Sequence, residues 1–177
     1  MGNSDVQFKH GHKYLGGYNG EYRNKWIQNK IEKWENLITT ISQAAYRYPQ
    51  SAYTAFAQSL QDELIYIQRA NRLPAQTFQL LEIKIKEELI FALFQSDLGL
   101  ELPREISSMV VQNGGHGLAN LAEMTLTHFD NSIDTTFLLC ISILSNQPLD
   151  VGGYQSQVTK CRQANQAKKD KKEEKLF

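Results

Sequence analysis

The sequence is poor in several features that would assign it to a protein class at once. It has two cysteines, Cys140 and Cys161, and no C-x-x-C pair, which excludes a disulfide scaffold and a cysteine-based zinc site and favours a reducing compartment. Its most apolar run, from Phe137 to Leu144, is far shorter than the roughly 20 residues that a membrane-spanning helix needs. No apolar signal segment opens the chain, and Val6 stands where a myristoylation signal requires serine or threonine. We therefore expect an intracellular chain, cytoplasmic or nuclear, with no contact to a membrane.

The motifs of self-sufficient catalysis are missing as well. The sequence contains no Asp-Asp pair, no G-x-S-x-G nucleophile turn and no phosphate-binding G-x-x-x-x-G-K-[ST] loop. His10 and His12 form an H-x-H pair to which His116 or His128 would have to add a metal ligand. No carboxylate spacing supports such a site, so surface histidines are the better interpretation. We expect no catalytic residue, no metal site and no cofactor in this chain.

Charge of neither sign dominates the 177 residues, because 19 lysines and arginines balance 19 acids. The distribution is nevertheless uneven. Residues 9–33 carry six cations and two acids, for +4, and residues 151–177 carry seven and three, also for +4. Residues 61–105 carry five cations and eight acids, for −3, and residues 106–150 contain four acids and no lysine or arginine, for −4. A polyanion is therefore expected to contact the ends of the chain rather than its middle.

Glycine is concentrated near the N-terminus, where residues 1–20 are predicted to contain a short β-hairpin. Four glycines lie among apolar and aromatic residues within residues 6–20, at Gly11, Gly16, Gly17 and Gly20. Glycines at this density break a helix and permit a tight backbone turn.

Residues 21–95 carry a helical pattern. From Arg23 to Tyr48 the apolar residues recur at steps of four and three, which places them on one helix face: Ile27, Ile31, Trp34, Ile38, Ile41, Ala45 and Tyr48. Pro49 and Pro74 each end one helix and begin the next, where the missing N–H of proline is harmless, and the same spacing continues in the second and third helices. Three helices joined by such short connections run antiparallel to their neighbours. We therefore predict an up-down-up three-helix bundle.

The rest of the chain is predicted to be helical around one tight loop. Residues 96–150 hold a short helix, a glycine-rich loop at residues 113–117 and a longer helix from Asn120. The second half of the longer helix is apolar, which predicts burial on most sides and makes Cys140 a small core residue. Residues 151–177 are rich in Gln, Lys and Glu and are interpreted as a solvated helix or a disordered tail. The predicted fold class is thus mainly α, with a short N-terminal β-hairpin, a three-helix bundle and further helices.

Three stretches of the sequence resemble one protein family. Gly11-His12-Lys13-Tyr14-Leu15-Gly16-Gly17 resembles the aromatic-Leu-Gly turn that follows the catalytic strands of reverse transcriptases and grips the primer end. Residues 111–118 look like the Gly-Gly-Leu-Gly loop found after the thumb of many retrotransposon polymerases, with His116 where leucine is usual, and residues 49–63 look like a thumb helix of such elements. The resemblance implies the C-terminal portion of such a polymerase, with a primer-grip hairpin in residues 1–20, a thumb-like bundle in residues 21–95 and a downstream helical region in residues 96–150.

The same resemblance implies what the chain does and what it lacks. The fingers, the palm strands and the aromatic-x-Asp-Asp motif have no counterpart in this sequence, so the chain is expected to be inactive alone. Contact with the backbone of an RNA or DNA template–primer duplex carries over, with a palm domain as the missing partner. The candidate binding residues are the turn and the cations beside it: Lys13, Tyr14, Leu15, Gly16, Gly17, Arg23 and Lys25.

A free-standing helical interaction module without a nucleic-acid role is the alternative. In that case the glycine turn is an ordinary hairpin with surface lysines nearby. An apolar face left exposed where a palm would dock favours the polymerase piece, whereas a fully closed bundle favours the module.

Overall fold

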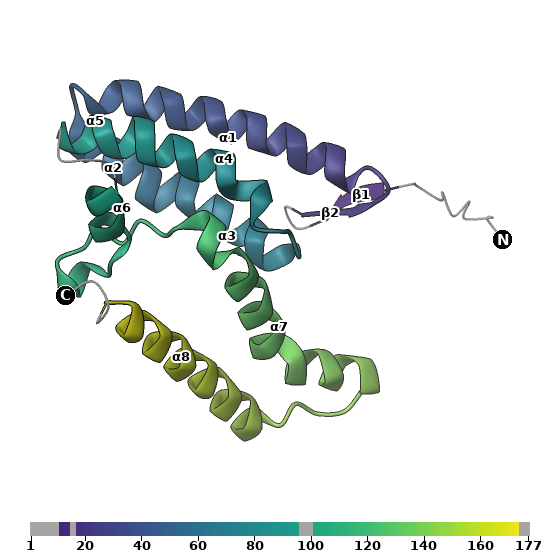
Figure 1. Cartoon of the computed structure of the whole chain (residues 1–177). Helices are drawn as coiled ribbons and strands as arrows, with labels where there is room; N and C mark the ends of the chain where they lie inside the picture. Colours follow the sequence, from purple (N-terminus) through teal and green to yellow (C-terminus); the bar gives the residue numbers. More distant parts are fainter. Residues whose placement is uncertain (1–10, 15–16, 96–100, 174–177) are drawn as a thin grey trace.

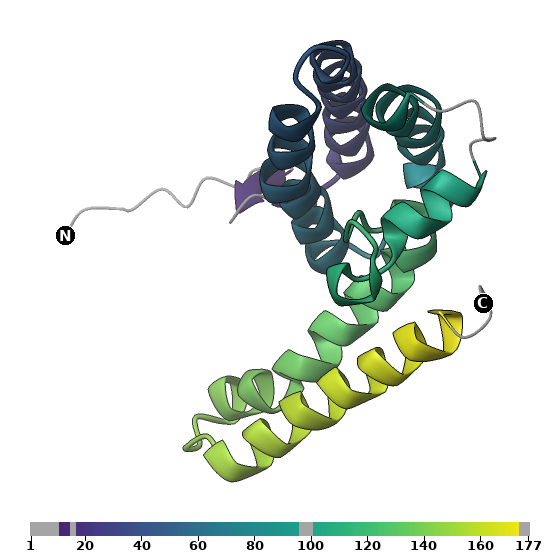
Figure 2. The ribbon, with the colours of Figure 1, turned by 90° about the vertical axis from the view of Figure 1, so that its left-hand side faces the viewer.

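Three antiparallel helical stretches form the centre of the molecule (Figures 1 and 2). The computed structural model describes residues 11–14, 17–95 and 101–173. The first stretch is α1 (Arg23–Ala45), the second runs through α2 (Pro49–Ala55), η1 (Phe56–Leu60) and α3 (Gln61–Ala70), and the third runs through α4 (Gln76–Lys84), η2 (Ile85–Ile90) and α5 (Phe91–Phe94). The mainly helical fold and the three-helix bundle predicted from the sequence are confirmed.

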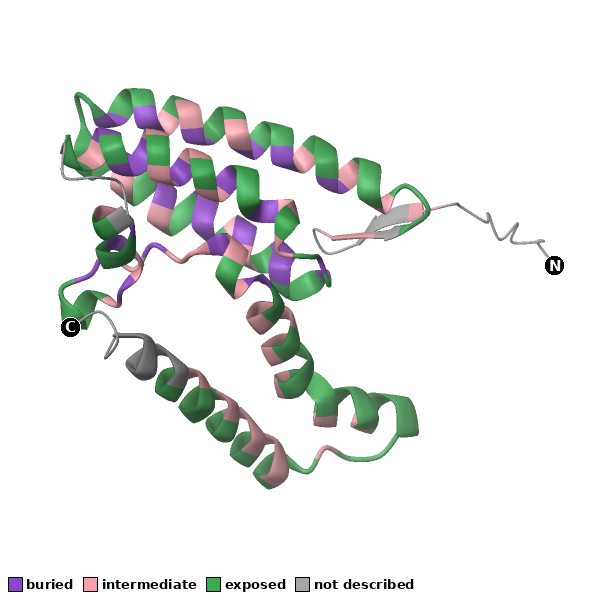
Figure 3. Cartoon of the chain, viewed as in Figure 1, coloured by how far each residue is buried: buried purple, intermediate pink, exposed green. Residues whose placement is uncertain are grey.

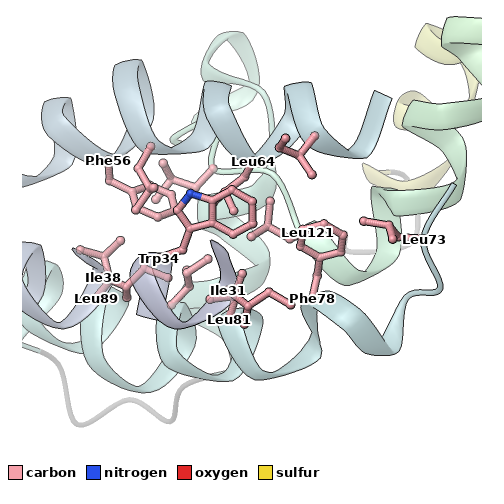
Figure 4. Packing of buried hydrophobic residues seen from close by; sticks show 14 of the residues in the cluster. Ile31, Trp34, Ile38, Phe56, Leu64, Leu73, Phe78, Leu81, Leu89 and Leu121 are labelled. Carbon is pink, nitrogen blue, oxygen red and sulfur yellow. The ribbon is translucent and has the colours of Figure 1, made fainter. Parts of the chain in front are cut away.

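The core of the bundle lies where the apolar face of α1 meets the other two stretches (Figure 4). Trp34 is 1% exposed and belongs to one buried cluster with residues of all three stretches, Phe56 and Leu89 among them. The predicted apolar face of α1 holds as far as Ala45. It fails at Tyr48, which is 55% exposed, because the residue before a proline avoids helical backbone angles and α1 has already ended.

Polar side chains also join α1 to the third stretch. The Lys84 ammonium and the Thr39 hydroxyl each donate a hydrogen bond to the Glu88 carboxylate, at 2.8 and 2.7 Å. These two hydrogen bonds, the one from Lys84 above all, hold the pKa of Glu88 below its usual range.

The second and third stretches each contain one π-helical segment, η1 and η2. In an α-helix a step of four residues overshoots a full turn by about 40°, so two such steps in succession move a side chain off the core face. The π segments lie where the buried positions repeat at four and four rather than four and three. The positions concerned are Phe56, Leu60 and Leu64 in the second stretch and Leu81, Ile85 and Leu89 in the third. The wider turn keeps all three positions of each set in the core.

Two short strands precede the bundle. β1 (Gly11–Tyr14) pairs antiparallel with β2 (Gly17–Gly20), with Gly11 opposite Gly20 and Tyr14 opposite Gly17. The ring of Tyr18 stacks on that of Trp26 in α1 at a centroid distance of 6.0 Å. This contact fixes the strands against the first turn of α1.

The segment before α7 completes the core of the bundle. α6 (Glu101–Ser108) and the 3₁₀ turn η3 (Val111–Asn113) lead to α7 (Leu121–Ser145), whose first turn is capped by the Asn120 side chain. Leu118 and Leu121 are buried in the same cluster as Trp34. The start of α7 is therefore held by the bundle.

Beyond its first turns α7 leaves the bundle and forms an arm with α8 (Val151–Glu173), which runs back beside it (Figures 1 and 2). The Gln157 side chain donates a hydrogen bond to the backbone oxygen of Asp134, which joins the two helices. Of the two interpretations of the basic tail, a solvated helix is the one found, as far as Glu173.

The predicted burial of the second half of α7 is wrong. Figure 3 shows this part of the helix as mostly exposed, and Phe137 and Leu144 are 52% and 86% exposed. Cys140 is exposed too, so it is not a core residue. Apolar composition predicts burial only where a partner surface exists, and α8 covers one side of α7 while the core of the bundle ends near Thr125.

Candidate nucleic-acid interface

The sequence-predicted binding residues gather at the end of the bundle that carries the two strands. Lys13 and Tyr14 lie on β1 and Gly17 begins β2, while Leu15 and Gly16 lie outside the described residues. The Tyr18–Trp26 stack places this hairpin against the beginning of α1, where Arg23 and Lys25 stand (Figure 1). The structure therefore brings together those predicted residues that it describes.

Arg23 has a role inside the fold. Its Nη2 donates a hydrogen bond of 2.9 Å to the backbone oxygen of Arg72, in the connection between α3 and α4. Its Nε is buried without a hydrogen-bond partner. Because a guanidinium has five N–H donors in a fixed plane, one bond to Arg72 holds the group in place and leaves other donors for a ligand.

The three lysines of α1 differ in exposure and in pairing. Lys25 and Lys33 are exposed. Lys30, by contrast, forms an ion pair of 2.5 Å with Glu63 of α3 and lies 5.7 Å from the centre of the Trp34 ring. The excess of +4 counted along residues 9–33 therefore overstates the charge that α1 offers to a ligand.

Two arginines that the sequence analysis missed lie at the same end of the bundle. Arg69 is in the last turn of α3, Arg72 follows that helix, and both are exposed. An antiparallel second helix ends where the first begins, so these residues return to the side of Arg23, as the bond to the Arg72 oxygen shows. The predicted antiparallel topology already implied this location for Arg69 and Arg72. The net negative charge of residues 61–105 argued against a basic site in this part of the chain.

We call Arg23, Lys25, Arg69 and Arg72 the basic end of the bundle. Glu21 is the acid closest to them along the chain, and it is exposed. In protein–nucleic acid complexes guanidinium and ammonium groups neutralise backbone phosphates, and such contacts do not read the base sequence.

The glycine-rich loop at residues 113–117 packs against the bundle. A Cβ at Gly115 would lie 2.3 Å from the backbone oxygen of Met109, and Gly117 has a φ of +68°, which side chains disfavour. The Tyr53 hydroxyl donates to the backbone oxygen of His116, and Gln61 bonds the loop through both its amide atoms. These contacts turn the loop toward the bundle and use its backbone groups internally.

His116 occupies the position at which the resemblance to retrotransposon polymerases departs from leucine. Its ring is half-buried and meets the edge of Phe94 at a centroid distance of 4.9 Å, with Tyr53 at 6.2 Å. Its Nδ1 is buried without a hydrogen-bond partner. The histidine thus fills an apolar position among aromatic rings, as a leucine would.

The other predicted histidines do not converge. His10 lies outside the described residues, and the Nδ1 of His128 is 2.6 Å from the Gln68 side-chain oxygen. Within the part of the chain that the structure describes, no three His, Cys, Asp or Glu side chains are grouped to hold a metal ion. None of the helices described is both long enough and apolar enough to cross a bilayer.

No protein-family model matches the chain, and no curated protein or solved structure matches it.

Proposed function

We propose that this chain is a piece of a retroelement reverse transcriptase, consisting of the primer-grip hairpin, the thumb and the helices that follow. It is non-catalytic alone and binds the backbone of a template–primer duplex weakly through the basic end. The observation that carries the proposal is that Arg69 and Arg72, from the second helical stretch, lie at the same end of the bundle as Arg23 and Lys25. This shared location adds to the resemblance of residues 11–17 and 111–118 to that family.

The arginine and lysine side chains of the basic end determine how duplex binding depends on base sequence and on salt concentration. Phosphate contacts from arginine and lysine are independent of base sequence and release condensed counterions. The logarithm of the association constant falls by about 0.9 per neutralised phosphate for each unit of log salt, so four contacts give a slope of about −3 to −4. Duplexes of unrelated sequence should bind with equal affinity.

The decisive variant removes three cations and leaves the fold intact. We expect the triple variant Lys25→Gln, Arg69→Gln, Arg72→Gln to flatten the salt slope by about 2 to 3 units, measured by fluorescence anisotropy with a labelled RNA–DNA duplex. Arg23 is kept, because its side chain holds the connection between α3 and α4. The bond from Arg23 goes to the backbone of Arg72, so replacing the Arg72 side chain does not remove it.

A matched control carries the same change in charge elsewhere. Lys33, Lys160 and Arg162 are exposed and lie away from the basic end, so replacing all three by glutamine should leave the slope unchanged. A second control replaces the tail lysines Lys168, Lys169, Lys171 and Lys172. The proposal fails if duplex binding is absent at low salt, or if either control abolishes it.

The helical interaction module remains the second candidate, and one observation favours it. The bundle is closed around Trp34, and Leu118 and Leu121 complete its core, which is the arrangement expected of a module that folds by itself. The exposed side chains of Phe137 and Leu144 lie in the second half of α7, outside this core. The duplex-binding experiment separates the two candidates, because the module has no reason to bind phosphates with a salt slope set by the basic end.

A further inference from the structure

The C-terminal end of α3 and the connection after it carry two of the four cations of the basic end, Arg69 and Arg72. The last carbonyl groups of an α-helix have no partner within the helix, so the backbone here relies on groups from elsewhere. The Arg72 oxygen accepts a hydrogen bond of 2.9 Å from the side chain of Arg23. The Arg69 oxygen accepts one of 2.8 Å from the hydroxyl of Ser132, on α7. Side chains from two other helices, α1 and α7, therefore fasten the backbone that carries these arginines.

Ser132 reaches the end of α3 because α7 packs along that helix (Figure 1). The hydroxyl of Ser132 also lies 2.9 Å from the backbone oxygen of Phe129 in its own helix, so its single hydrogen is shared between that oxygen and the one of Arg69. The bond within α7 restricts the rotamer of Ser132 and keeps its oxygen beside α3. The serine is therefore held in the position from which it bonds the Arg69 backbone.

A buried amide of α3 fixes α7 in this place. Gln68 is 0% exposed, and its side-chain nitrogen donates to the backbone oxygen of Leu121 at 2.8 Å and to the hydroxyl oxygen of Thr125 at 3.0 Å. Because both amide hydrogens are used, the amide oxygen accepts from Nδ1 of His128, which lies 2.6 Å away. These three partners and Ser132 follow one another at steps of four, three and four, which places them on one face of α7, directed at α3.

We propose that Ser132 is a positioning residue of the basic end, which holds the C-terminal backbone of α3 so that Arg69 and Arg72 are presented to the phosphates of a duplex. This inference rests on the proposed function, because it gives α7 a part in that binding. Side chains and backbone that become ordered on binding reduce the affinity, and a backbone that is already ordered reduces it less. The bond from α7 thus strengthens binding without adding a charge or a contact to the nucleic acid.

Positioning and charge have different effects on duplex binding. We expect Ser132→Ala to weaken binding by about twofold to tenfold at a fixed salt concentration, which is the effect of ordering one further side chain. The slope of log association constant against log salt should not change, because the same phosphates are neutralised. Ser132→Thr keeps a hydroxyl and should bind like the unchanged chain. Ser145→Ala is the matched control, because the hydroxyl of Ser145 bonds the backbone oxygen of Ile141 at the far end of α7.

A double-mutant cycle tests whether Ser132 acts through the two arginines. In a chain with Arg69→Gln and Arg72→Gln, the further change Ser132→Ala should leave the residual affinity unchanged, because the side chains that it positions are gone. Fluorescence anisotropy with the labelled RNA–DNA duplex at low salt gives the four affinities. If Ser132→Ala weakens binding as much in this background as in the unchanged chain, the serine does not act through the arginines and the proposal is refuted.

A measurement on the free chain separates this inference from the proposed function. Backbone amide relaxation measured by NMR should give lower order parameters for residues 69–72 in Ser132→Ala than in the unchanged chain, whether or not nucleic acid binds. Unchanged order parameters, or an unchanged duplex affinity of Ser132→Ala, would overturn the positioning role while the proposed function stands. If the unchanged chain binds no duplex at low salt, the proposed function falls and the role in binding with it, and lower order parameters would then show a bond that serves the fold alone.

Discussion

Trp34 and Lys33 are neighbours in the sequence with opposite environments. Trp34 is 1% exposed at the centre of the bundle, whereas Lys33 points to solvent from the next position of α1. Successive residues of a helix lie about 100° apart, so one step along the chain moves a side chain from the core to the surface. Substitutions at these two neighbouring positions should therefore have a large and a small effect, respectively, on the free energy of unfolding.

We expect Trp34→Ala to lower the free energy of unfolding by about 3–5 kcal/mol, because it removes a large buried ring and leaves a cavity. This is a large share of the roughly 5–15 kcal/mol that stabilises a typical domain. Lys33→Ala should change it by less than about 0.5 kcal/mol. Thermal denaturation followed by circular dichroism measures both, and equal melting temperatures for Trp34→Ala and the unchanged chain would contradict the core assignment.

At the scale of elements, one buried arginine joins α6, the third helical stretch and the start of α7. The Arg104 side chain is 5% exposed and forms an ion pair with Glu82 of α4, while its two terminal nitrogens donate to the backbone oxygens of Leu118 and Ala119. Glu82 also accepts from the backbone N–H of Leu121. All these groups are paired, so the connection to α7 has a single defined path over the bundle.

Removing one partner of this ion pair should be more harmful than removing both. Arg104→Met leaves the carboxylate of Glu82, which is 14% exposed, without its cation, and we expect a loss of about 3–5 kcal/mol in the free energy of unfolding. The double variant Arg104→Met, Glu82→Leu should recover part of that loss, because no buried charge remains. Urea denaturation provides the measurement. A double variant that is as unstable as the sum of the two single variants would contradict the predicted coupling.

The π segments show how local sequence and packing interact within an element. Steps of four and four between buried positions are visible in the sequence, at Phe56, Leu60 and Leu64 and again at Leu81, Ile85 and Leu89. An undistorted α-helix would turn the third position of each set away from Trp34. Burial of all three side chains of each set favours the wider π turn. The backbone of the helix is therefore adjusted to the packing of the core.

For the whole molecule, the missing paired carboxylates bear on polymerase activity. Two-metal phosphoryl transfer needs paired carboxylates about 4 Å apart, and the sequence has no Asp-Asp pair. Within the described residues no three acidic, histidine or cysteine side chains are grouped so that they could hold a metal ion. We expect no primer extension by the purified chain on RNA or DNA templates with Mg²⁺ or Mn²⁺. Nucleotide incorporation that persists through stringent purification would disprove this expectation.

The candidate site was predictable in part. Lys13, Arg23 and Lys25 follow from their closeness along the chain to the glycine turn. Arg69 and Arg72 are far from that turn along the chain, and they come to the same end of the bundle only through the antiparallel return of the second helical stretch. The predicted topology implied that return, but the acidic balance of residues 61–105 directed attention away from these two arginines. Arg23 also shows that a cation in a suitable place can serve the fold, since it bonds the backbone of Arg72.

The three-helix bundle and the burial of Trp34 and Ile38 follow from local signals, the periodicity of apolar residues and the two prolines, and could therefore be predicted from the sequence. Which apolar surface packs against a partner depends instead on tertiary structure. Leu118 and Leu121, after the glycine loop, entered the core, whereas the more apolar second half of α7 stayed exposed. Composition states how strongly a face favours burial, but burial itself requires a second surface within reach, and that depends on the path of the whole chain.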